Sequence, residues 1–199
     1  RNNHREEAPT MARVPLLIKE QAALEVQEVF QRVEARGARV MNIYRALAHS
    51  KAAMLPFLRL GNSLLEHCHL DHRLRELAIL RVASLTGSQY EWSQHVVLAR
   101  ESGVTQDQMD AMGEWRSSAA FDERDRAVLT FTDEMALQIR VQDDTFQEVS
   151  RHLDEASIVE LSLSVGFWGM VARLLEGLQV EIDPELPGSS AETLGRRRH

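Results

Sequence analysis

Two segments of the sequence are apolar on every side of a helix. Residues 77–86 contain one charged side chain, Arg81, and residues 161–172 contain none but include Phe167 and Trp168. A helix with no polar face is buried on all sides. Both segments therefore predict helices that lie either at the centre of the domain or in a subunit interface. Two such helices in a chain of 199 residues favour a homo-oligomer whose core is shared between subunits.

The rest of the chain also repeats apolar residues at helical spacing, and no run of alternating residues indicates a strand. Capping residues mark several helix starts, including the capping boxes Thr105–Gln108 and Thr145–Glu148. Pro56 fits the first turn of a helix. The expected helices are 24–33, 41–47, 56–66, 71–86, 90–102, one from Thr105, 122–139, one from Thr145, and 154–178. This pattern predicts an all-α bundle.

Length and composition suggest one domain with a loose segment at each end. Residues 1–10 are polar and patternless, and we expect a flexible N-terminal leader there. Residues 11–183 form the expected single helical domain. Residues 184–199 contain glycine, serine and three consecutive arginines, which is typical of a flexible, solvated tail.

Charge and cysteine content exclude several classes of function. The formal net charge of −7 argues against a nucleic-acid partner. The uncharged stretch 161–172 is shorter than the roughly 20 residues that span a bilayer, and no signal peptide opens the chain, so we expect no membrane partner. The single cysteine, Cys68, cannot form a disulfide within the chain. We therefore expect a cytoplasmic protein.

Two charged residues interrupt the first apolar helix. Glu76 lies at its entry and Arg81 lies among leucine, alanine and valine. A buried charge is costly unless it is paired, so each should have a partner. Arg81 either forms a structural pair with a carboxylate or holds a substrate carboxylate. Glu76 is either structural or catalytic.

The next helix carries candidate partners on one face. Ser88, Glu91 and His95 follow Gly87 at spacings that share a helix face. If Gly87 turns the chain into an antiparallel hairpin, Glu76 and His95 lie at similar depths and come close. Two carboxylates and an imidazole on apolar helices would form an acid–base site. A structural alternative remains: Ser88 and Glu91 form a capping box and His95 is a packed histidine.

Residues 66–72 concentrate three histidines, Cys68 and two acids. His67 and His69 do not face the same side of a helix, and no second cluster of cysteine and histidine follows. This segment is predicted to be a polar loop rather than a metal site.

The segment 75–95, RELAILRVASLTGSQYEWSQH, resembles the core motif of the carboxymuconolactone decarboxylase family, which includes the AhpD-like alkylhydroperoxidases. Residues 96–105, VVLARESGVT, and 165–176, VGFWGMVARLLE, continue the likeness, which extends over about 40–183. The resemblance implies an all-α, AhpD-like, oligomeric helical bundle.

The redox branch of that family carries a glutamate, a Cys-x-x-Cys motif and a histidine. Glu76 and His95 match the outer two positions, but Ser88 and Glu91 occupy the cysteine positions, and Cys68 lies outside the motif. A thiolate is the nucleophile in peroxide chemistry, which these residues cannot supply. The resemblance therefore implies the non-redox branch, which is cofactor-free and usually forms a homo-oligomer, a trimer or hexamer.

The resemblance and the residues together suggest a cofactor-independent acid–base enzyme. We expect it to act on a small carboxylic acid or lactone as a decarboxylase-like enzyme, or as an isomerase or lyase. The expected catalytic residues are His95, Glu76 and Glu91, and the expected substrate-binding residues are Tyr90, Trp92, Trp168 and Arg81. One alternative is a non-catalytic oligomer that binds a small molecule. A less favoured alternative is a thiol peroxidase of the alkylhydroperoxidase type.

Overall fold

A computed structural model describes residues 12–183, and every regular element in that range is helical. The elements are η1 (Lys19–Gln21), α1 (Leu24–Ala35), α2 (Asn42–Leu47), α3 (Lys51–Glu66), α4 (His72–Thr86), α5 (Gln89–Glu101), α6 (Gln106–Asp110), η2 (Met112–Ser117), α7 (Glu123–Gln138), α8 (Asp143–Val149) and α9 (Glu155–Leu178). The predicted all-α fold is confirmed. The expected leader, 1–10, and tail, 184–199, lie outside the described residues.

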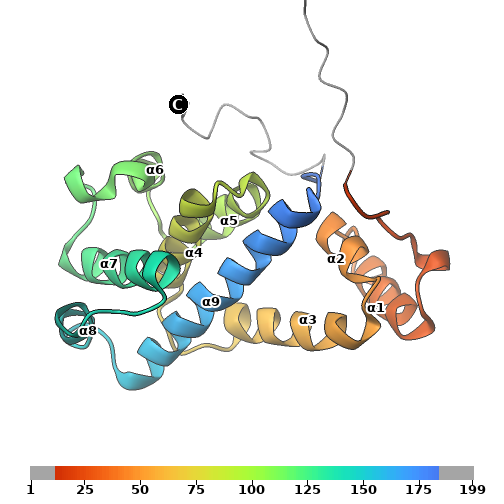
Figure 1. The fold of residues 1–199 in the computed structure, drawn as a ribbon, viewed down its shortest axis with the longest axis horizontal. Coiled ribbons are helices and arrows are strands. Elements are labelled where there is room, and N and C mark those ends of the chain that lie inside the picture. Colours follow the sequence, from red (N-terminus) through yellow and green to blue (C-terminus); the bar gives the residue numbers. More distant parts are fainter. Residues whose placement is uncertain (1–11, 184–199) are drawn as a thin grey trace, which may run out of the picture.

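Helix α4 is the centre of the fold. It packs against α5, α7 and α9, and ten consecutive residues from Leu74 to Ala83 are buried (Figure 1). This explains why the segment has no polar face. The carboxylate of Asp71 accepts from the N–H of Leu74 and begins the helix, and Gly87 ends it with a φ of 72°. A left-handed residue at this position favours glycine and reverses the chain into α5.

Helix α9 is the second core helix and crosses the middle of the molecule (Figure 1). It is longer than the uncharged stretch 161–172 indicates. By length and composition it is apolar enough to cross a membrane, as no other helix within 12–183 is. However, 56% of its most apolar window is buried inside the protein. A core helix meets the same criteria, and the contacts of α9 with α3, α4, α5 and α7 are those of a core helix.

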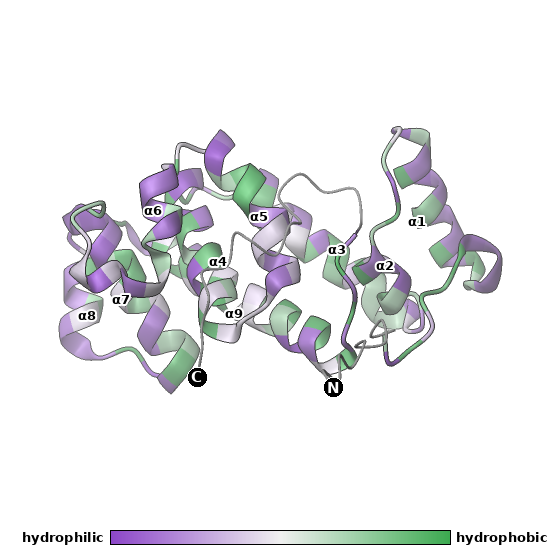
Figure 2. Ribbon diagram, turned by 90° about the horizontal axis from the view of Figure 1, so that it is seen from above, coloured by the Kyte–Doolittle hydropathy of each residue, from purple (hydrophilic) through white to green (hydrophobic). Residues whose placement is uncertain are grey.

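The remaining helices extend to either side of this centre. Figure 1 shows α1 and α2 at one end, α6 to α8 at the other, and α3 running beneath α9. Several outer helices alternate hydrophilic and hydrophobic residues around their axes, as Figure 2 shows. Helix α1, for example, buries Val26, Val29 and Phe30. This is the pattern of helices that cover a core on one side only.

Two predicted helix starts are wrong. Helix α3 begins at Lys51, so Pro56 lies inside it rather than in its first turn. Pro56 removes one backbone hydrogen bond from the helix. The burial of Met54 and Leu64 in the core offsets this loss. Helix α8 begins at Asp143, and the hydroxyl of Thr145 donates to Glu134 instead of capping the helix. By contrast, the capping box Thr105–Gln108 is confirmed.

Candidate active site

The hairpin of α4 and α5 brings Glu76 and His95 together. Nδ1 of His95 lies 2.8 Å from Oε2 of Glu76. The Glu76 side chain is fully buried and His95 is 6% exposed. The predicted approach of these two residues is therefore confirmed, and it depends on the turn at Gly87.

Arg75 holds the other oxygen of Glu76. Its Nε and Nη2 donate to Oε1 of Glu76 over 3.2 and 3.1 Å, and its Nη1 donates to the carbonyls of Leu64 and Leu65. Arginine stays charged in proteins, so Glu76 is a carboxylate with a permanent counterion. The attraction within the pair offsets the desolvation cost of burying both charges. It also leaves Oε2 of Glu76 free to accept from His95.

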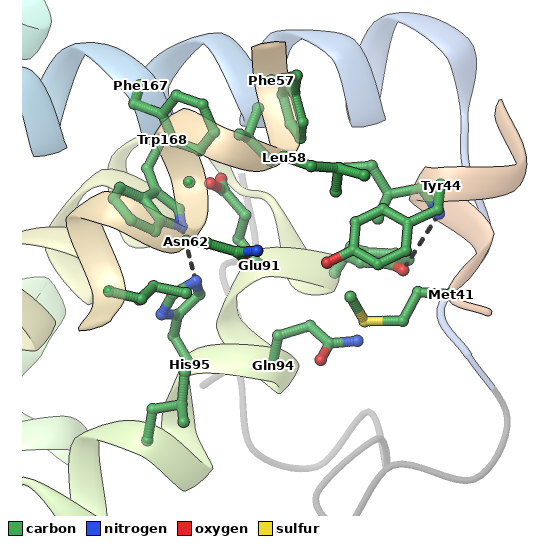
Figure 3. A pocket seen from close by; sticks show the side chains of 16 residues that line it. Met41, Tyr44, Phe57, Leu58, Asn62, Glu91, Gln94, His95, Phe167 and Trp168 are labelled. Atoms are coloured by element: carbon green, nitrogen blue, oxygen red, sulfur yellow. Dashed lines mark hydrogen bonds between the residues drawn. The ribbon is translucent and has the colours of Figure 1, made fainter. Parts of the chain in front are cut away.

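Trp168 on α9 completes the environment of His95. Its indole N–H donates to Nε2 of His95 over 2.7 Å, and the two rings meet edge to face with centroids 5.3 Å apart (Figure 3). An indole N–H can only donate, so Nε2 is an acceptor without a proton. Nδ1 therefore carries the proton and donates to Glu76. His95 is a neutral imidazole with a fixed tautomer.

Glu91 differs from every other buried carboxylate in this site. It is 1% exposed, and neither of its oxygens has a hydrogen-bond partner. Burial, and after it the negative charge of Glu176, raises the pKa of Glu91 to about 9. The side chain is therefore a neutral carboxylic acid at neutral pH, with an O–H to donate.

The capping explanation for Ser88 and Glu91 is wrong. Ser88 is the N-cap residue of α5 by its backbone, but its side chain makes no capping hydrogen bond and its Oγ is buried without a partner. Glu91 lies at the third helical position, but it lines the cavity and its oxygens are unbonded. The helix start therefore does not account for either side chain.

A cavity of about 150 Å³ opens beside these residues. Helices α2, α3, α5 and α9 enclose it (Figure 3). Its lining comprises Met41, Ile43, Tyr44, Phe57, Leu58, Gly61, Asn62, Leu65, Tyr90, Glu91, Gln94, His95, Leu98, Phe167, Trp168 and Val171. Most of these are apolar or aromatic, which is typical of a small-molecule site with a few polar groups.

The structure brings some predicted site residues to this cavity and leaves others away from it. Glu91, His95, Tyr90 and Trp168 line it, and Glu76 lies behind His95. Trp92 is buried elsewhere on α5 and does not line it. Arg81 is also absent from the lining.

Arg81 has a structural role. Its Nε and Nη2 donate to the carboxylate of Asp133 on α7, and its Nη1 donates to the carbonyl of Met112. Trp115 and Arg116 donate to the same carboxylate. The guanidinium therefore joins α4, η2 and α7, and of the two interpretations of Arg81 the structural pair is confirmed.

Tyr90 lines the cavity with its ring but uses its hydroxyl for structure. The hydroxyl donates to Oδ2 of Asp183 and accepts from the backbone N–H of Ile43. Burial, followed by the hydrogen bond to the Asp183 carboxylate, raises the pKa of Tyr90 well above its ordinary value. Oδ1 of Asp183 accepts from the N–H of Asn42 over 3.0 Å. Asp183 thus ties the start of α2 to α5 across the cavity wall.

Sequence reasoning missed Gln94 and Asn62, two amides that line the cavity (Figure 3). Nε2 of Gln94 is buried and has no partner. Gln94 follows Glu91 by three residues, so the helical spacing that selected Glu91 could also have selected it. Asn62 on α3 had no such signal, because it meets the site only through tertiary packing.

Two histidines of segment 66–72 each lie beside a single carboxylate. Within 12–183, no three histidine, cysteine, aspartate or glutamate side chains are grouped so that they could hold a metal ion. His69 lies 3.6 Å from Asp154 and His67 lies 3.9 Å from Glu66. Cys68 is partly buried, and burial together with nearby Glu160 raises the pKa of its thiol. A raised pKa makes a thiol less reactive.

Solved structures of similar fold include two peroxidase-related proteins. One, from Ralstonia eutropha JMP134, matches with a TM-score of 0.76 at 17% identity over 89% of this chain and 95% of that chain. The other, from Silicibacter sp. TM1040, matches with a TM-score of 0.75 at 20% identity over 89% of this chain and 94% of that chain. These identities are low, so the likeness concerns the fold.

The chain is also similar to the debrominase Bmp8 in complex with 2,3,4-tribromopyrrole. The TM-score is 0.73 at 18% identity, over 94% of this chain and 98% of that chain. This likeness again concerns the fold alone. No curated protein matched the chain.

Residues 51–134 match the family described as the carboxymuconolactone decarboxylase family. The matched segment begins with α3 and ends within α7, so it contains the α4–α5 hairpin and with it Glu76, Glu91 and His95. The family match and the AhpD-like fold agree. Over residues 51–134, less than half of its length, the chain is similar to the carboxymuconolactone decarboxylase family, and its fold is AhpD-like.

Proposed function

We propose that the protein is a cofactor-independent acid–base enzyme that acts on a small carboxylic acid or lactone. One observation carries the proposal. The carboxyl group of Glu91 is buried without a partner in an apolar cavity, one helical turn from the hydrogen-bonded pair of Glu76 and His95. A buried polar group without a partner is costly, and functional sites are where such costs are retained.

Glu91 is suited to donate a proton. Its pKa of about 9 keeps the proton on the carboxyl group at neutral pH, while remaining near enough to neutrality for transfer. General acid catalysis of this kind contributes about 10²–10⁴-fold to a rate. In the proposed reaction Glu91 protonates a carbon or oxygen atom of the bound substrate.

His95 is suited to accept a proton once the indole N–H of Trp168 no longer binds its Nε2. The single in-plane lone pair of His95 Nε2 accepts the N–H of the Trp168 indole. When a substrate group displaces that N–H, Nε2 can take a proton from the substrate. Glu76 then stabilises the imidazolium through Nδ1, as an orienting carboxylate does for a catalytic histidine.

Two reaction types suit these groups. A decarboxylation leaves electrons on an enolate that must be protonated at carbon. A double-bond shift in a lactone removes one proton and adds another. The decarboxylation breaks the bond to carbon dioxide and needs an acid to protonate the enolate carbon, whereas the double-bond shift needs both a base and an acid. In both, the chain's own residues carry the protons. That Bmp8, a debrominase of the same fold, was solved with tribromopyrrole supports a small ring as the occupant of the cavity.

A direct test uses two small lactones. A β,γ-unsaturated γ-lactone reports isomerisation by ultraviolet absorbance, and the same ring with a carboxylate reports decarboxylation by carbon dioxide release. We expect turnover of at least one, with a loss of about 10²-fold or more in Glu91→Gln and His95→Gln. Glu101→Gln changes an exposed glutamate on the same helix and should leave the rate unchanged. Equal rates in all four proteins would contradict the proposal.

A non-catalytic binding protein is the alternative. The wild-type protein would then bind a small molecule in the cavity but produce no turnover of either lactone. The unpartnered Glu91 favours catalysis, because a purely apolar binding site gains nothing from a buried carboxyl group without a partner.

A thiol peroxidase is less well supported. Ser88 and Glu91 stand where the redox branch has cysteines, and the raised pKa of Cys68 disfavours a thiolate. A thiol-dependent peroxide assay should show no activity above background. Peroxide turnover that disappears in Cys68→Ser would support the peroxidase instead.

We further propose that the protein forms a homo-oligomer, a trimer or hexamer, through one exposed apolar face. Val159, Leu163 and Met170 lie exposed along one side of α9, and Leu137 and Ile139 lie exposed at the end of α7. Ile139 is 80% exposed and has a φ of 69°, which is strained for a β-branched residue. Light scattering should report an oligomer, and Leu163→Asp should reduce its mass.

A further inference from the structure

Cationic side chains are missing from the described lining of the cavity. Among residues 12–183, none that lines it is a lysine or arginine. The buried guanidinium of Arg75, which pairs with Glu76 behind His95, is fully engaged by Glu76 and by the carbonyls of Leu64 and Leu65. Arg45 on α2 donates to the carbonyls of Leu16 and Leu17 and to Asn42. A carboxylate entering this cavity would lose its hydration and gain no counterion, which is strongly unfavourable.

The cavity does offer hydrogen-bond donors without partners. The carboxyl group of Glu91 and Nε2 of Gln94 are both buried and unbonded. A neutral carboxylic acid donates one hydrogen bond, and an amide nitrogen donates two. These groups suit an uncharged oxygen that accepts, such as a carbonyl or lactone oxygen. Figure 3 shows both side chains among the aromatic and aliphatic residues of the lining.

The size of the cavity limits the ligand to a small molecule. A volume of about 150 Å³ is comparable to a cavity that holds one benzene ring. Phe57, Phe167 and Trp168 form a cluster on one wall, with Phe57–Phe167 and Phe167–Trp168 centroids 4.9 and 5.0 Å apart. Flat apolar walls of this kind favour a ring over a branched chain.

We propose that the ligand of this cavity is an uncharged, single-ring carbonyl compound, such as a lactone or cyclic ketone, whose oxygen accepts a hydrogen bond from Glu91. This inference rests on the proposed function, since it takes the cavity to be the substrate site. It narrows the substrate from a carboxylic acid or lactone to the uncharged member of that pair. Gln94 is assigned as a second donor that determines specificity for an oxygen acceptor.

The charge of Glu91 controls this recognition. The titratable groups around it are Tyr44 on α2, Tyr90 and His95 on α5, Glu76 on α4 behind His95, Glu176 on α9, and Asp183 beyond Tyr90. Helix α3 contributes the uncharged Asn62. Above the pKa of Glu91, about 9, the carboxyl group loses its O–H and repels a carbonyl oxygen. Binding of an uncharged carbonyl compound should weaken there.

The test compares two probes of similar size by ligand-observed NMR titration of the full chain at neutral pH. Cyclohexanone carries an uncharged carbonyl, and cyclohexanecarboxylate carries a charge. We expect cyclohexanone to bind at least tenfold more tightly, and its affinity to fall at least fivefold above about pH 9. Glu91→Gln keeps a donor and should bind cyclohexanone at both pH values alike. Gln94→Leu should weaken cyclohexanone binding without changing the pH dependence. Glu101→Gln is the matched control and should behave as wild type.

The outcomes separate this inference from the proposed function. The inference would be overturned if the carboxylate bound as tightly as cyclohexanone or more tightly, or if neither probe bound. It would also be overturned if the cyclohexanone affinity of the wild type stayed the same above about pH 9, as it should in Glu91→Gln. Binding of cyclohexanone with no turnover of any lactone would support the inference and contradict the enzyme. Turnover of the carboxylated lactone, with tight carboxylate binding, would support the enzyme and contradict the inference.

Discussion

Nε2 of His95, the nitrogen that would take a proton from a substrate, already accepts the indole N–H of Trp168 over 2.7 Å. Its other nitrogen is engaged by Glu76. Every hydrogen-bonding position of His95 is therefore filled, while Glu91 one turn away has no partner at all. Glu91 can therefore form a hydrogen bond with a ligand directly, whereas Nε2 of His95 can do so only after the Trp168 indole has moved.

Replacing Trp168 with phenylalanine removes the N–H and keeps an aromatic ring against Phe167. If the indole competes with substrate for Nε2, losing a hydrogen bond of about 1 kcal/mol should raise kcat/KM by about fivefold. Steady-state kinetics on the responding lactone measures this. Trp92→Phe also removes a buried indole N–H, but away from the cavity, and should leave the rate unchanged. A tenfold loss in Trp168→Phe would show instead that the N–H assists the reaction.

Replacing Arg81 tests its structural role. Arg81→Met leaves the carboxylate of Asp133 buried without its main partner, which should lower the free energy of unfolding by about 3–5 kcal/mol. Arg116 contacts the same carboxylate, but its side chain is 60% exposed. Arg116→Ala should therefore cost less than about 1 kcal/mol. Urea denaturation of both variants gives the comparison. Similar losses in the two would mean that the buried pair contributes no more than the exposed one.

The sequence predicts the scaffold better than it predicts the site. The apolar segments 77–86 and 161–172 indicate α4 and α9 as core helices because burial on all sides leaves a local signature. The meeting of Glu76 and His95 was equally predictable, since one glycine turn and the helical rise determine their depths.

The remaining site residues come from tertiary packing that no local pattern encodes. Trp168 reaches His95 from a helix 73 positions along the chain. Asp183 contacts Asn42 and Tyr90, which precede it by 141 and 93 positions. Capping at Ser88 and Glu91 failed as a prediction because the motif describes which residues can cap, while the packing of α5 decides where their side chains point.

Replacing Asp183 with asparagine should loosen the cavity wall. One carboxylate oxygen accepts from the N–H of Asn42 and the other from the hydroxyl of Tyr90. An asparagine amide has only one accepting oxygen, so it would lose one of these two hydrogen bonds. We expect a loss of about 1–3 kcal/mol in stability and faster hydrogen exchange in α2, with the N–H of Ile43 included. Glu181→Gln alters the exposed side chain two residues away and should leave exchange in α2 as it is. Unchanged exchange in Asp183→Asn would show that α2 is held by its apolar contacts alone.

The buried carboxyl group of Glu91 should make stability depend on pH. Its pKa rises from an ordinary 4.5 to about 9 in the folded protein, so between these values the folded protein holds a proton that the unfolded chain has released. The unfolded state binds fewer protons, and the free energy of unfolding therefore falls as pH rises, by up to about 1.4 kcal/mol per pH unit. Glu91→Gln has no such proton.

The stability of Glu91→Gln relative to wild type should increase steadily from about pH 5 to about pH 9, as measured by urea denaturation across that range. Glu101→Gln, on the exposed side of the same helix, should show a constant difference from wild type. Parallel curves for wild type and Glu91→Gln would mean that Glu91 ionises normally in the folded protein, and both its role as an acid and its role as a donor to an uncharged ligand would then be untenable.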